Sequence, residues 1–505
     1  MKYLYNIITI FVLIGFVSCR NDFDFETSSG TDLRFSRDTV YLDTIFSNIG
    51  SSTYTLKVYN TTNNDIKIPS LKLGNGENSN FRLMVDGVAG KVFNNVELLA
   101  KDSMFIFVET TVDIQSLTNQ KEFLYTDKIE FSSGNNSQKV ELVTLVKDAI
   151  FLYPQKFADG TKETLPLDGE EIEGFFLDEN DPINGNELIW TDDKPYVIYG
   201  YAAVPSNKTL EINAGAQIHF HDNSGLLVAN NGNINAVGSI QNPINFQGDR
   251  LEPGFEDFPG QWGTIWLTVG SSGNFENTII KNATIGLLIN KNQGTVNLHN
   301  LQVYNASDFG ILGRAGKIRG TNVVTNNCGQ AGLGCTFGGN YHFIQSTFAN
   351  YWNKPNQTSV VIDNYDGTPE FAIEQALFQN CIIYGSSSES LIMNNQGSNN
   401  VFNIKFDNSL IKFTDYSNQV FGTYPYDFNN STYFSNCLIA RTPQQYRPYF
   451  KNTKKNQMMI TDKSIDIIGI GNPFFAQQVP FDLLGNSRLS SPDLGAYQNI
   501  PESQE

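Results

Sequence analysis

The 505-residue chain carries 52 acidic and 34 basic residues, which gives a formal net charge of −18. No basic tract interrupts this excess, so the composition argues against nucleic acid as a partner. Polyanionic glycans are repelled as well, unless Ca²⁺ or a local basic patch intervenes. The five cysteines include no CxxC and no metal-type Cys/His spacing, so the sequence predicts neither a zinc site nor a redox motif. The length is ample for two or three domains.

The first residues predict an export signal. Lys2 precedes an apolar run from Ile7 to Val17, and Ser18 and Cys19 follow. A charged start, a short apolar core and small residues are typical of a signal peptide and not of a membrane span. FVSC resembles a lipobox, with Phe16 where leucine is commonest, and the resemblance implies cleavage before Cys19 and a lipid on its thiol. A plain signal peptide with an incidental cysteine is the alternative.

Residues 1–18 are therefore predicted to be a lipoprotein signal peptide, and residues 19–30 an acidic, flexible tether. Acidic residues directly after a lipidated cysteine resemble the surface-export signal of some Gram-negative lineages. The resemblance implies an outer-membrane protein, anchored by lipid and facing the cell surface.

Residues 31–148 alternate apolar and polar side chains in seven phrases separated by polar turns. The phrases are RFSRDTVYLDTIF, TYTLKVYNTT, DIKIPSLKL, FRLMVDG, SMFIFVETTV, YTDKIEFSS and QKVELVTLV. This pattern predicts an antiparallel β-sandwich. Its start resembles the immunoglobulin-like modules that often follow lipoprotein anchors, which implies a spacer or a surface for docking a partner.

Residues 149–196 are acidic and rich in loop residues, and we expect them to form a transition that caps the next domain, since an uncovered sheet end presents unpaired strand edges. Asp178, Asn180 and Asp181 crowd oxygen ligands as a Ca²⁺ loop does. The EF-hand spacing is not met, so a solvated loop is the alternative. No cofactor other than this possible Ca²⁺ is predicted.

Between residues 197 and 445 one short phrase recurs. It reads FENTIIKN at Phe275, LHNLQVYN at Leu298, IRGTNVVT at Ile318, FIQSTFAN at Phe343, FQNCIIYG at Phe378, FDNSLIKF at Phe406 and FSNCLIAR at Phe434. Its third position recurs after 23, 20, 25, 35, 28 and 28 residues. One strand phrase every 20–30 residues or so predicts stacked coils that bury their apolar faces against each other. A propeller would need four strands per unit of roughly 40–45 residues.

In this register the first residues of the seven phrases are expected to form one interior stack, with coils about 4.8 Å apart. Asn282, Asn305 and Asn350 are expected to form an asparagine ladder. The pattern resembles the right-handed parallel β-helix of pectate-lyase-like proteins, and LEINAGAQIHF followed by QWGTIWL resembles the opening coils of such surface proteins. The predicted fold class is all-β: an N-terminal antiparallel β-sandwich followed by a right-handed parallel β-helix.

Two groups of residues are candidates for function. The insertion RLEPGFEDFPG leaves the stack as a surface loop, and its binding candidates are Asp249, Arg250, Glu252, Phe255, Asp257 and Phe258. An internally satisfied charge cluster is the alternative for this loop. Lys281, Arg314 and Arg319 in neighbouring coils form the only compact basic patch that the sequence suggests. Residues 446–505, with the motif SPDLGAY, resemble the closing segment of exported β-helix proteins and are expected to form C-terminal coils and a cap.

The sequence does not predict an enzyme clearly. Polysaccharide lyases of this fold use a Lys or Arg base with carboxylates, and the hydrolases use paired carboxylates. The residues before the ladder asparagines read Lys281, Tyr304, Ala349 and Tyr384, with no row of carboxylates. His219, His221, His299 and His342 are interpreted as surface or structural. The favoured hypothesis is a non-enzymatic surface lipoprotein that binds polysaccharide or an outer-membrane protein. The alternatives are a carbohydrate-active enzyme and a structural stalk.

Overall fold

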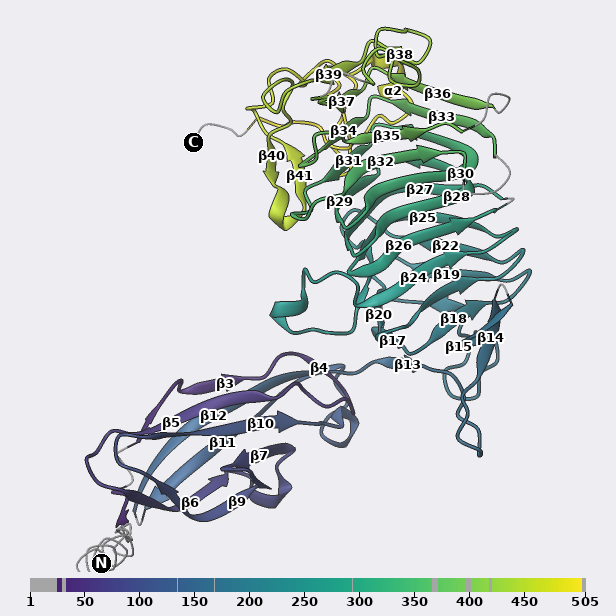
Figure 1. Cartoon of the computed structure of the whole chain (residues 1–505). Helices are drawn as coiled ribbons and strands as arrows, with labels where there is room; N and C mark the ends of the chain where they lie inside the picture. Colours follow the sequence, from purple (N-terminus) through teal and green to yellow (C-terminus); the bar gives the residue numbers. More distant parts are fainter. Residues whose placement is uncertain are drawn as a thin grey trace, which may run out of the picture. The chain divides into compact units, whose positions relative to one another are not determined.

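The computed structural model describes residues 25–29, 33–133, 135–167, 169–292, 294–365, 371–396, 401–416 and 420–501. The predicted signal peptide and Cys19 lie outside these residues, as does most of the predicted tether. The chain divides into two compact units, residues 1–148 and 149–505. Each unit is described by itself (Figure 1).

The first unit is a sandwich of two sheets. One contains β1 (Glu26–Thr27), β6 (Ile66–Leu73), β11 (Glu122–Ser133), β12 (Asn136–Lys147), β3 (Thr39–Tyr41), β4 (Ile45–Phe46) and β9 (Val92–Leu98). The other contains β2 (Leu33–Phe35), β5 (Tyr54–Asn60), β10 (Ser103–Thr110), β7 (Phe81–Val85) and β8 (Val88–Gly90). Short 3₁₀ turns lie at Gly76–Asn78 and Ile114–Ser116. The long strands pair antiparallel, and alternate side chains fill one apolar core, as the period-two pattern predicts.

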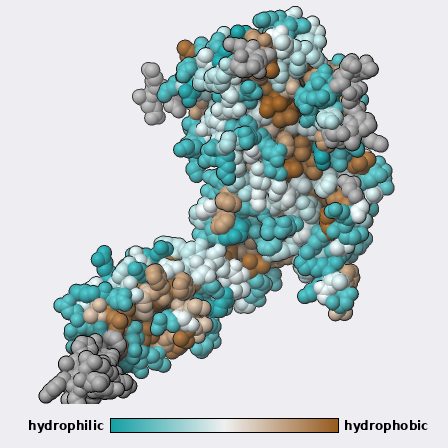
Figure 2. Space-filling view, viewed as in Figure 1, coloured by the Kyte–Doolittle hydropathy of each residue, from teal (hydrophilic) through white to brown (hydrophobic). Residues whose placement is uncertain are grey.

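Three details of the sandwich differ from the prediction. Strand β9 was missed because it is a largely exposed strand without apolar alternation. The first predicted phrase is divided among β2, β3 and β4, which lie in different sheets. The end of the predicted tether forms β1, which pairs in parallel with β6. Figure 2 shows hydrophobic side chains gathered on the visible face of this unit.

The second unit is a parallel β-helix whose coils each contribute strands to three faces. Face I contains β15 (Glu170–Phe176), β18 (Tyr201–Val204), β21 (Gly225–Val228), β24 (Trp262–Leu267), β26 (Ala283–Asn290), the first parts of β28 (Phe309–Thr321) and β30 (Ala331–Ile344), β32 (Thr358–Asp363) and β35 (Leu391–Asn394). Face II contains β16 (Ile189–Trp190), β19 (Thr209–Asn213), β22 (Asn233–Val237), the first parts of β25 (Ser272–Lys281) and β27 (Val296–Ala306), the second parts of β28 and β30, β33 (Ile373–Gln379), β36 (Phe402–Asp407) and β38 (Phe434–Ser435).

Face III contains β13 (Ile150–Leu152), β17 (Tyr196–Ile198), β20 (Gln217–Phe220), β23 (Ile244–Gly248), the second parts of β25 and β27, β29 (Val324–Cys328), β31 (Thr347–Asn350), β34 (Ile382–Gly385), β37 (Leu410–Lys412) and β39 (Leu438–Ala440). The stacked strands are visible in Figure 1. A sandwich followed by a parallel β-helix confirms the predicted fold class.

The acidic segment 149–196 supplies the first coil of the helix and not a separate cap. Its strands β13, β15 and β16 pair with the strands of the next coil on all three faces. Strand β14 (Thr164–Leu167) forms a hairpin with β15. Trp190 and Tyr196 stack with ring centroids 5.1 Å apart inside this coil, which starts the apolar core that continues through the unit.

The predicted interior stack is present, with one correction. Phe378, Phe406 and Phe434 lie directly above one another, with ring centroids 5.0 and 5.3 Å apart. In the third coil, however, the residue aligned with Leu298 is Gly320 and not Ile318. The prediction followed the apolar residue, whereas the ring of Phe343 in the next coil fills the space above the glycine. A Cβ atom at Gly320 would lie 2.3 Å from the Phe343 ring.

The corrected register reveals an amide column at the bend between faces II and III. Its members all have positive φ and are Asn277, Asn300, Asn322, Gln345, Asn380, Asn408 and Asn436. Asn300 donates to Asn277 and Asn322 donates to Asn300, both at 2.8 Å, and Asn408 donates to Asn380 at 3.0 Å. The expected ladder at Asn282, Asn305 and Asn350 is different: Asn305 accepts from Asn327, and Asn350 bonds the backbone of Cys328.

Residues after Ala440 lie along the outer surface of face III and do not cap the last coil. They include β40 (Phe450–Asn452), a 3₁₀ turn at Thr453–Lys455, β41 (Gln457–Ile460) and α2 (Pro473–Ala476). Apolar side chains of this tail pack on those of face III from Tyr304 to Leu410. The end of the core is covered instead by residues 420–433, where Phe428 contacts Phe434.

The motif SPDLGAY is not a strand, and its acidic residue anchors the tail. Asp493 is fully buried and accepts hydrogen bonds from the backbone N–H groups of Gly469 and Asn499. Arg488, also fully buried, donates to the carbonyls of Phe481 and Gly495. Because buried charged groups must be hydrogen-bonded, these contacts fix the path of the tail.

The four cysteines of the β-helix are free thiols. Cys328, Cys335 and Cys381 are buried, and burial raises the pKa of the Cys328, Cys381 and Cys437 thiols to about 12. They remain protonated at neutral pH and serve as small apolar side chains.

The register correction is testable by a double substitution. We expect Gly320→Ala to lower the free energy of unfolding by about 1–3 kcal/mol, because the added methyl overpacks against Phe343. Phe343→Leu should relieve this contact, so the double variant should be less destabilised than the sum of the single variants. Denaturant-induced unfolding of the wild type, the two single variants and the double variant measures these free energies. Simple additivity would contradict the contact between the two residues.

Candidate functional site

The bend between faces III and I carries a column of polar and aromatic residues in the first coils. Tyr199, His221 and Asp249 each follow the last paired residue of a face III strand, since Ile198 pairs with Phe220 and Phe220 with Gly248. A β-helix repeats its bends at the spacing of hydrogen-bonded strands, so these three side chains are neighbours. The ring centroids of Tyr199 and His221 are 4.5 Å apart.

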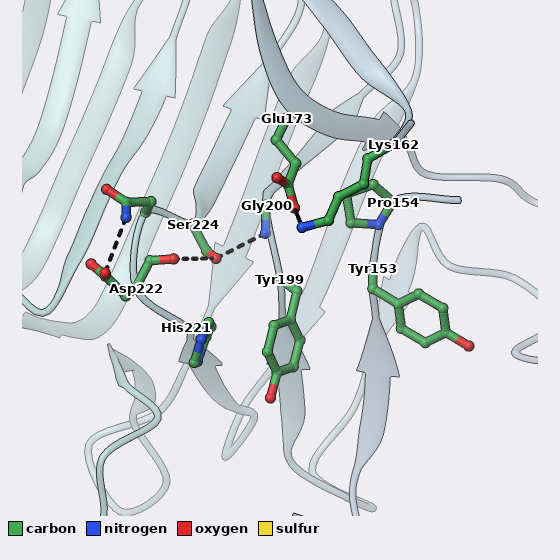
Figure 3. Close-up of a pocket in the computed structure, with 10 residues that line it drawn as sticks. Tyr153, Pro154, Lys162, Glu173, Tyr199, Gly200, His221, Asp222 and Ser224 are labelled. Carbon is green, nitrogen blue, oxygen red and sulfur yellow. Dashed lines mark hydrogen bonds and ion pairs between the residues drawn. The ribbon is translucent and has the colours of Figure 1, made fainter. Parts of the chain in front are cut away.

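An open cleft of about 590 Å³ lies beside this column. Figure 3 shows Tyr153, Tyr199 and His221 along one side and Lys162 with Glu173 along another. The floor is formed by the two bends that precede β18 and β21, where Gly200 N–H donates to Ser224 Oγ at 2.8 Å. Gly200 has a φ of +68°, and a Cβ atom there would lie 2.9 Å from Pro154. The cleft therefore requires glycine at this bend.

His221, which lines the cleft, is hydrogen-bonded to Asp249 of the next coil. His221 Nδ1 lies 2.7 Å from Asp249 Oδ2, with the imidazole 48% exposed and the carboxylate 14% exposed. Burial raises the pKa of Asp249, and the bond to His221 opposes that shift. Burial also raises the pKa of Tyr199, and the nearby Asp249 carboxylate adds to the effect. The imidazole stays half-exposed beside the cleft, where its ring can hydrogen-bond a ligand.

The two charged side chains on the opposite wall neutralise each other. Lys162 Nζ and the Glu173 carboxylate form an ion pair between the two strands of the β14–β15 hairpin region. Tyr153 is 59% exposed and stands at the open side. Aromatic faces beside hydrogen-bonding groups of both polarities suit a ligand that has apolar ring faces and hydroxyl groups.

The predicted binding loop is held by internal contacts. Arg250 forms a bidentate ion pair with Glu252 (2.7 and 3.1 Å) and stacks on the Phe255 ring at 3.8 Å. Asp257 lies 3.4 Å from Lys455 of the tail. Phe258 is 57% exposed and remains a contact candidate, while Asp249 bonds His221 in the wall of the cleft. A small cavity of about 100 Å³ separates the loop from the coils.

The predicted basic patch does not assemble. Lys281 lies on face III, Arg314 on face I and Arg319 on face II, because each is placed by a different strand ladder. Arg314 stacks on Phe337 at 4.6 Å. Arg319 donates to the Ile318 carbonyl at 3.0 Å, and burial lowers its pKa. The residues that directly precede the predicted ladder asparagines do not form an open surface either. Tyr304, Ala349 and Tyr384 are buried by the tail.

In the acidic loop of the first coil, the carboxylate oxygens accept hydrogen bonds from backbone N–H groups of the loop itself. Asp178 accepts from Asn180 N–H, and Asp181 accepts from Ile183 and Asn184 N–H. Within the described ranges no group of three or more His, Cys, Asp or Glu side chains is placed to hold a metal ion. A search of the same ranges finds no helix with the length and apolarity needed to cross a membrane.

Sequence reasoning missed the cleft although a signal for it exists. Tyr199, His221 and Asp249 recur after 22 and 28 residues, which matches the coil period found later in the chain. The recurring phrase starts at Phe275, so it sets no register for the earlier coils. Tyr153 follows Leu152, which pairs with Ile198, so it precedes Tyr199 in the same column, but its separation of 46 residues from Tyr199 does not match the coil period.

Comparison with known proteins leaves the family open. No family model and no curated protein matches the chain. Among solved structures, it is similar to a family 123 glycoside hydrolase from Clostridium perfringens that hydrolyses glycolipid glycans (10% identity, TM-score 0.17), with 24% of this chain and 26% of that chain covered. The chain thus spans about a quarter of that enzyme.

Two further structures resemble parts of the chain. The PapD-like domain 7 of human CEP192 has 10% identity and a TM-score of 0.16, covering 26% of this chain and 96% of that one. The catalytic unit of a GH87 α-1,3-glucanase from Streptomyces thermodiastaticus has 9% identity and a TM-score of 0.23, covering 71% and 84%. All three TM-scores lie below 0.5, so none of these structures indicates a function for this chain.

Two half-buried histidines on face II predict a loss of stability in weak acid. Burial is the main cause that lowers the pKa of His299, which contacts Thr321 Oγ1, and of His342, which contacts Gln379. The folded protein therefore binds these protons less readily than the unfolded chain does, and stability falls as pH drops below about 6.5. Thermal unfolding between pH 7.5 and 5.5 should show this fall, and His299→Gln with His342→Gln should flatten it. An unchanged pH slope in the double variant would contradict the assignment.

Proposed function

We propose that the protein binds a glycan in the cleft at the bend between faces III and I, without catalysis. The observation that carries the proposal is the convergence of the Tyr199 and Tyr153 faces with the His221–Asp249 pair on one open cleft. A sugar ring stacks its C–H face on an aromatic ring, and its hydroxyl groups hydrogen-bond to neighbouring carboxylate, imidazole and amide groups.

The rigid scaffold supports recognition of an extended chain. The bends that form the cleft are fixed by the ladders of successive coils, so little conformational entropy is lost on binding. The open shape of the cleft admits the interior of a polysaccharide as well as its end. The loop after β23 begins at Asp249, which bonds His221 of the cleft. The exposed Phe258 of this loop is therefore a further candidate contact for a glycan chain on the same side of the β-helix.

The site would act at the cell surface. The lipobox-like FVSC motif and the acidic residues after Cys19 support a lipid-anchored outer-membrane location, in which the sandwich spaces the β-helix from the bilayer. This part of the proposal rests on sequence, and it is tested by radiolabelled palmitate incorporation that Cys19→Ala abolishes. Incorporation that persists in the variant would refute the anchor.

Binding at the cleft is tested with an array of neutral and acidic oligosaccharides. We expect Tyr199→Ala to weaken binding about 3- to 10-fold, because one aromatic stacking contact is lost. Tyr41→Ala removes a tyrosine that is more exposed than Tyr199, 67% exposed on β3 of the sandwich, and serves as the control outside the cleft. Equal losses in both variants, or no glycan bound by the wild type, would refute the proposal.

Catalysis by the same cleft is the second candidate, and the His221–Asp249 pair favours it. A buried carboxylate that orients an exposed imidazole is the arrangement of a general base. Product analysis after long incubation with each bound oligosaccharide distinguishes the two functions. Turnover that His221→Asn abolishes while binding persists would establish the enzyme, whereas unchanged ligand supports binding alone.

Docking to an outer-membrane protein has its own candidate surface on the sandwich. Met84, Val88, Phe105 and Phe107 are 39–61% exposed on β7, β8 and β10. Phe105 and Phe107 lie 6.5 Å apart, and Lys57 covers Phe105 at 5.1 Å. A cluster of solvent-exposed apolar side chains of this kind is typical of surfaces that bind another protein.

A further inference from the structure

The tail segment from Arg441 to Lys463 reverses the charge of the rest of the chain. It contains one acidic residue, Asp462, and six basic residues, which are Arg441, Arg447, Lys451, Lys454, Lys455 and Lys463. Its net charge is +5 in a chain of net charge −18. Segregation of this kind is a local electrostatic signal that the total composition conceals.

The six basic side chains, hereafter the basic strip, are exposed and mostly without acidic partners. Elsewhere in the β-helix the exposed cations Lys162, Lys208 and Arg250 pair with glutamates, while the exposed Lys156, Lys317 and Lys405 stand singly and not in a cluster. Within the described parts of the chain, Lys455 is the single member of the strip with a carboxylate in ion-pair range, Asp257 at 3.4 Å. The strip therefore keeps its charge available to solvent.

The fold directs these cations outward. In the β40–β41 hairpin, Met458 and Ile460 are buried against face III, and Phe450 meets Tyr351 with ring centroids 6.0 Å apart. Lys451 alternates with Phe450 and so points away from the helix. Lys454 and Lys455 occupy the 3₁₀ turn at the hairpin tip. Figure 1 shows the hairpin lying along the side of the coils.

A buried lysine beneath the strip increases its positive potential. Lys412 is 6% exposed, and its Nζ donates to the Gly385 carbonyl at 2.7 Å and lies 5.1 Å from the centre of the Tyr384 ring. The Tyr384 hydroxyl donates to the carbonyl of Pro443, which lies in the segment that carries the basic strip. This bond holds the segment beside Lys412. Burial lowers the pKa of Lys412, and the adjacent Arg447 adds to the effect. Two neighbouring cations without a carboxylate in ion-pair range in the described chain repel each other unless an anion lies between them.

We propose that the basic strip binds an anionic polysaccharide through its sulfate or carboxylate groups. Cations spread along a hairpin match the repeated charges of a linear chain, and Tyr449, 39% exposed and stacked beneath Arg447 at 5.0 Å, supplies a face for a sugar ring. An anionic bilayer is the less suitable partner, because a flat surface would also meet the negative remainder of the protein. This inference is independent of glycan binding in the cleft.

The test uses the full chain without its lipid and three soluble probes: dextran sulfate, polygalacturonate and unmodified dextran. A strip variant carries Arg447→Gln, Lys451→Gln and Lys454→Gln. The control variant carries Lys156→Gln, Lys317→Gln and Lys405→Gln, which neutralises three exposed lysines elsewhere on the β-helix. Biolayer interferometry at low and high salt measures affinity, and thermal unfolding verifies that both variants fold.

We expect binding to at least one polyanion, none to unmodified dextran, and weakening by salt. The strip variant should lose about tenfold or more in affinity, and the control variant less than about twofold. Equal losses in the two variants, or no polyanion binding at low salt, would overturn the proposal. Phosphatidylglycerol vesicles serve as a fourth probe, and binding to them but to neither polyanion would overturn the proposal in favour of a membrane contact. Tyr199→Ala should leave polyanion binding unchanged, which separates this site from the cleft.

Discussion

The amide column at the bend between faces II and III is the constraint on which the β-helix depends. Each member has a left-handed backbone, a conformation that asparagine tolerates better than other non-glycine residues. Several side-chain amides of the column also hydrogen-bond between coils, as Asn322 does with Asn300 of the preceding coil and Asn408 does with Asn380. Bend geometry and coil register are thereby fixed by the same residue. The phenylalanine stack inside the helix follows from this register, because the bend sets which residue begins each inward-facing phrase.

The same column holds the tail on face III. Asn322, Asn380 and Asn408 donate their second amide protons to the carbonyls of Phe481, Asn472 and Ile470. The outward residues of face III are apolar there, and the tail removes them from water. Covering one face leaves the bends between faces III and I and the outer surface of the tail open to ligands. Both candidate surfaces, the cleft and the basic strip, are found in these places.

The architecture could be predicted from the sequence, because period-two alternation and a recurring phrase report burial directly. The stack from Phe343 to Phe434 was predicted, and the single slip at Ile318 came from treating glycine as a spacer when it makes room for a ring. The basic patch failed for a different reason: a coil has three faces, and closeness in sequence does not say which face a residue occupies. The cleft and the path of the tail depend on contacts that span tens to more than a hundred residues, such as Asn322 with Phe481. No local pattern encodes the contacts of the tail, whereas the cleft has a periodic signal in coils that precede the recurring phrases.

Hydrogen–deuterium exchange on Asn322→Gly tests the role of the amide column most directly. Glycine accepts the positive φ of 52° without strain, so this variant removes the side-chain amide alone. The account predicts faster exchange in two separate peptides: the coil segments around residue 322, and the tail around Phe481 to Arg488, whose placement depends on the Asn322 bond. Faster exchange near residue 322 with an unchanged tail would contradict the claim that one column sets the register of the coils and holds the tail.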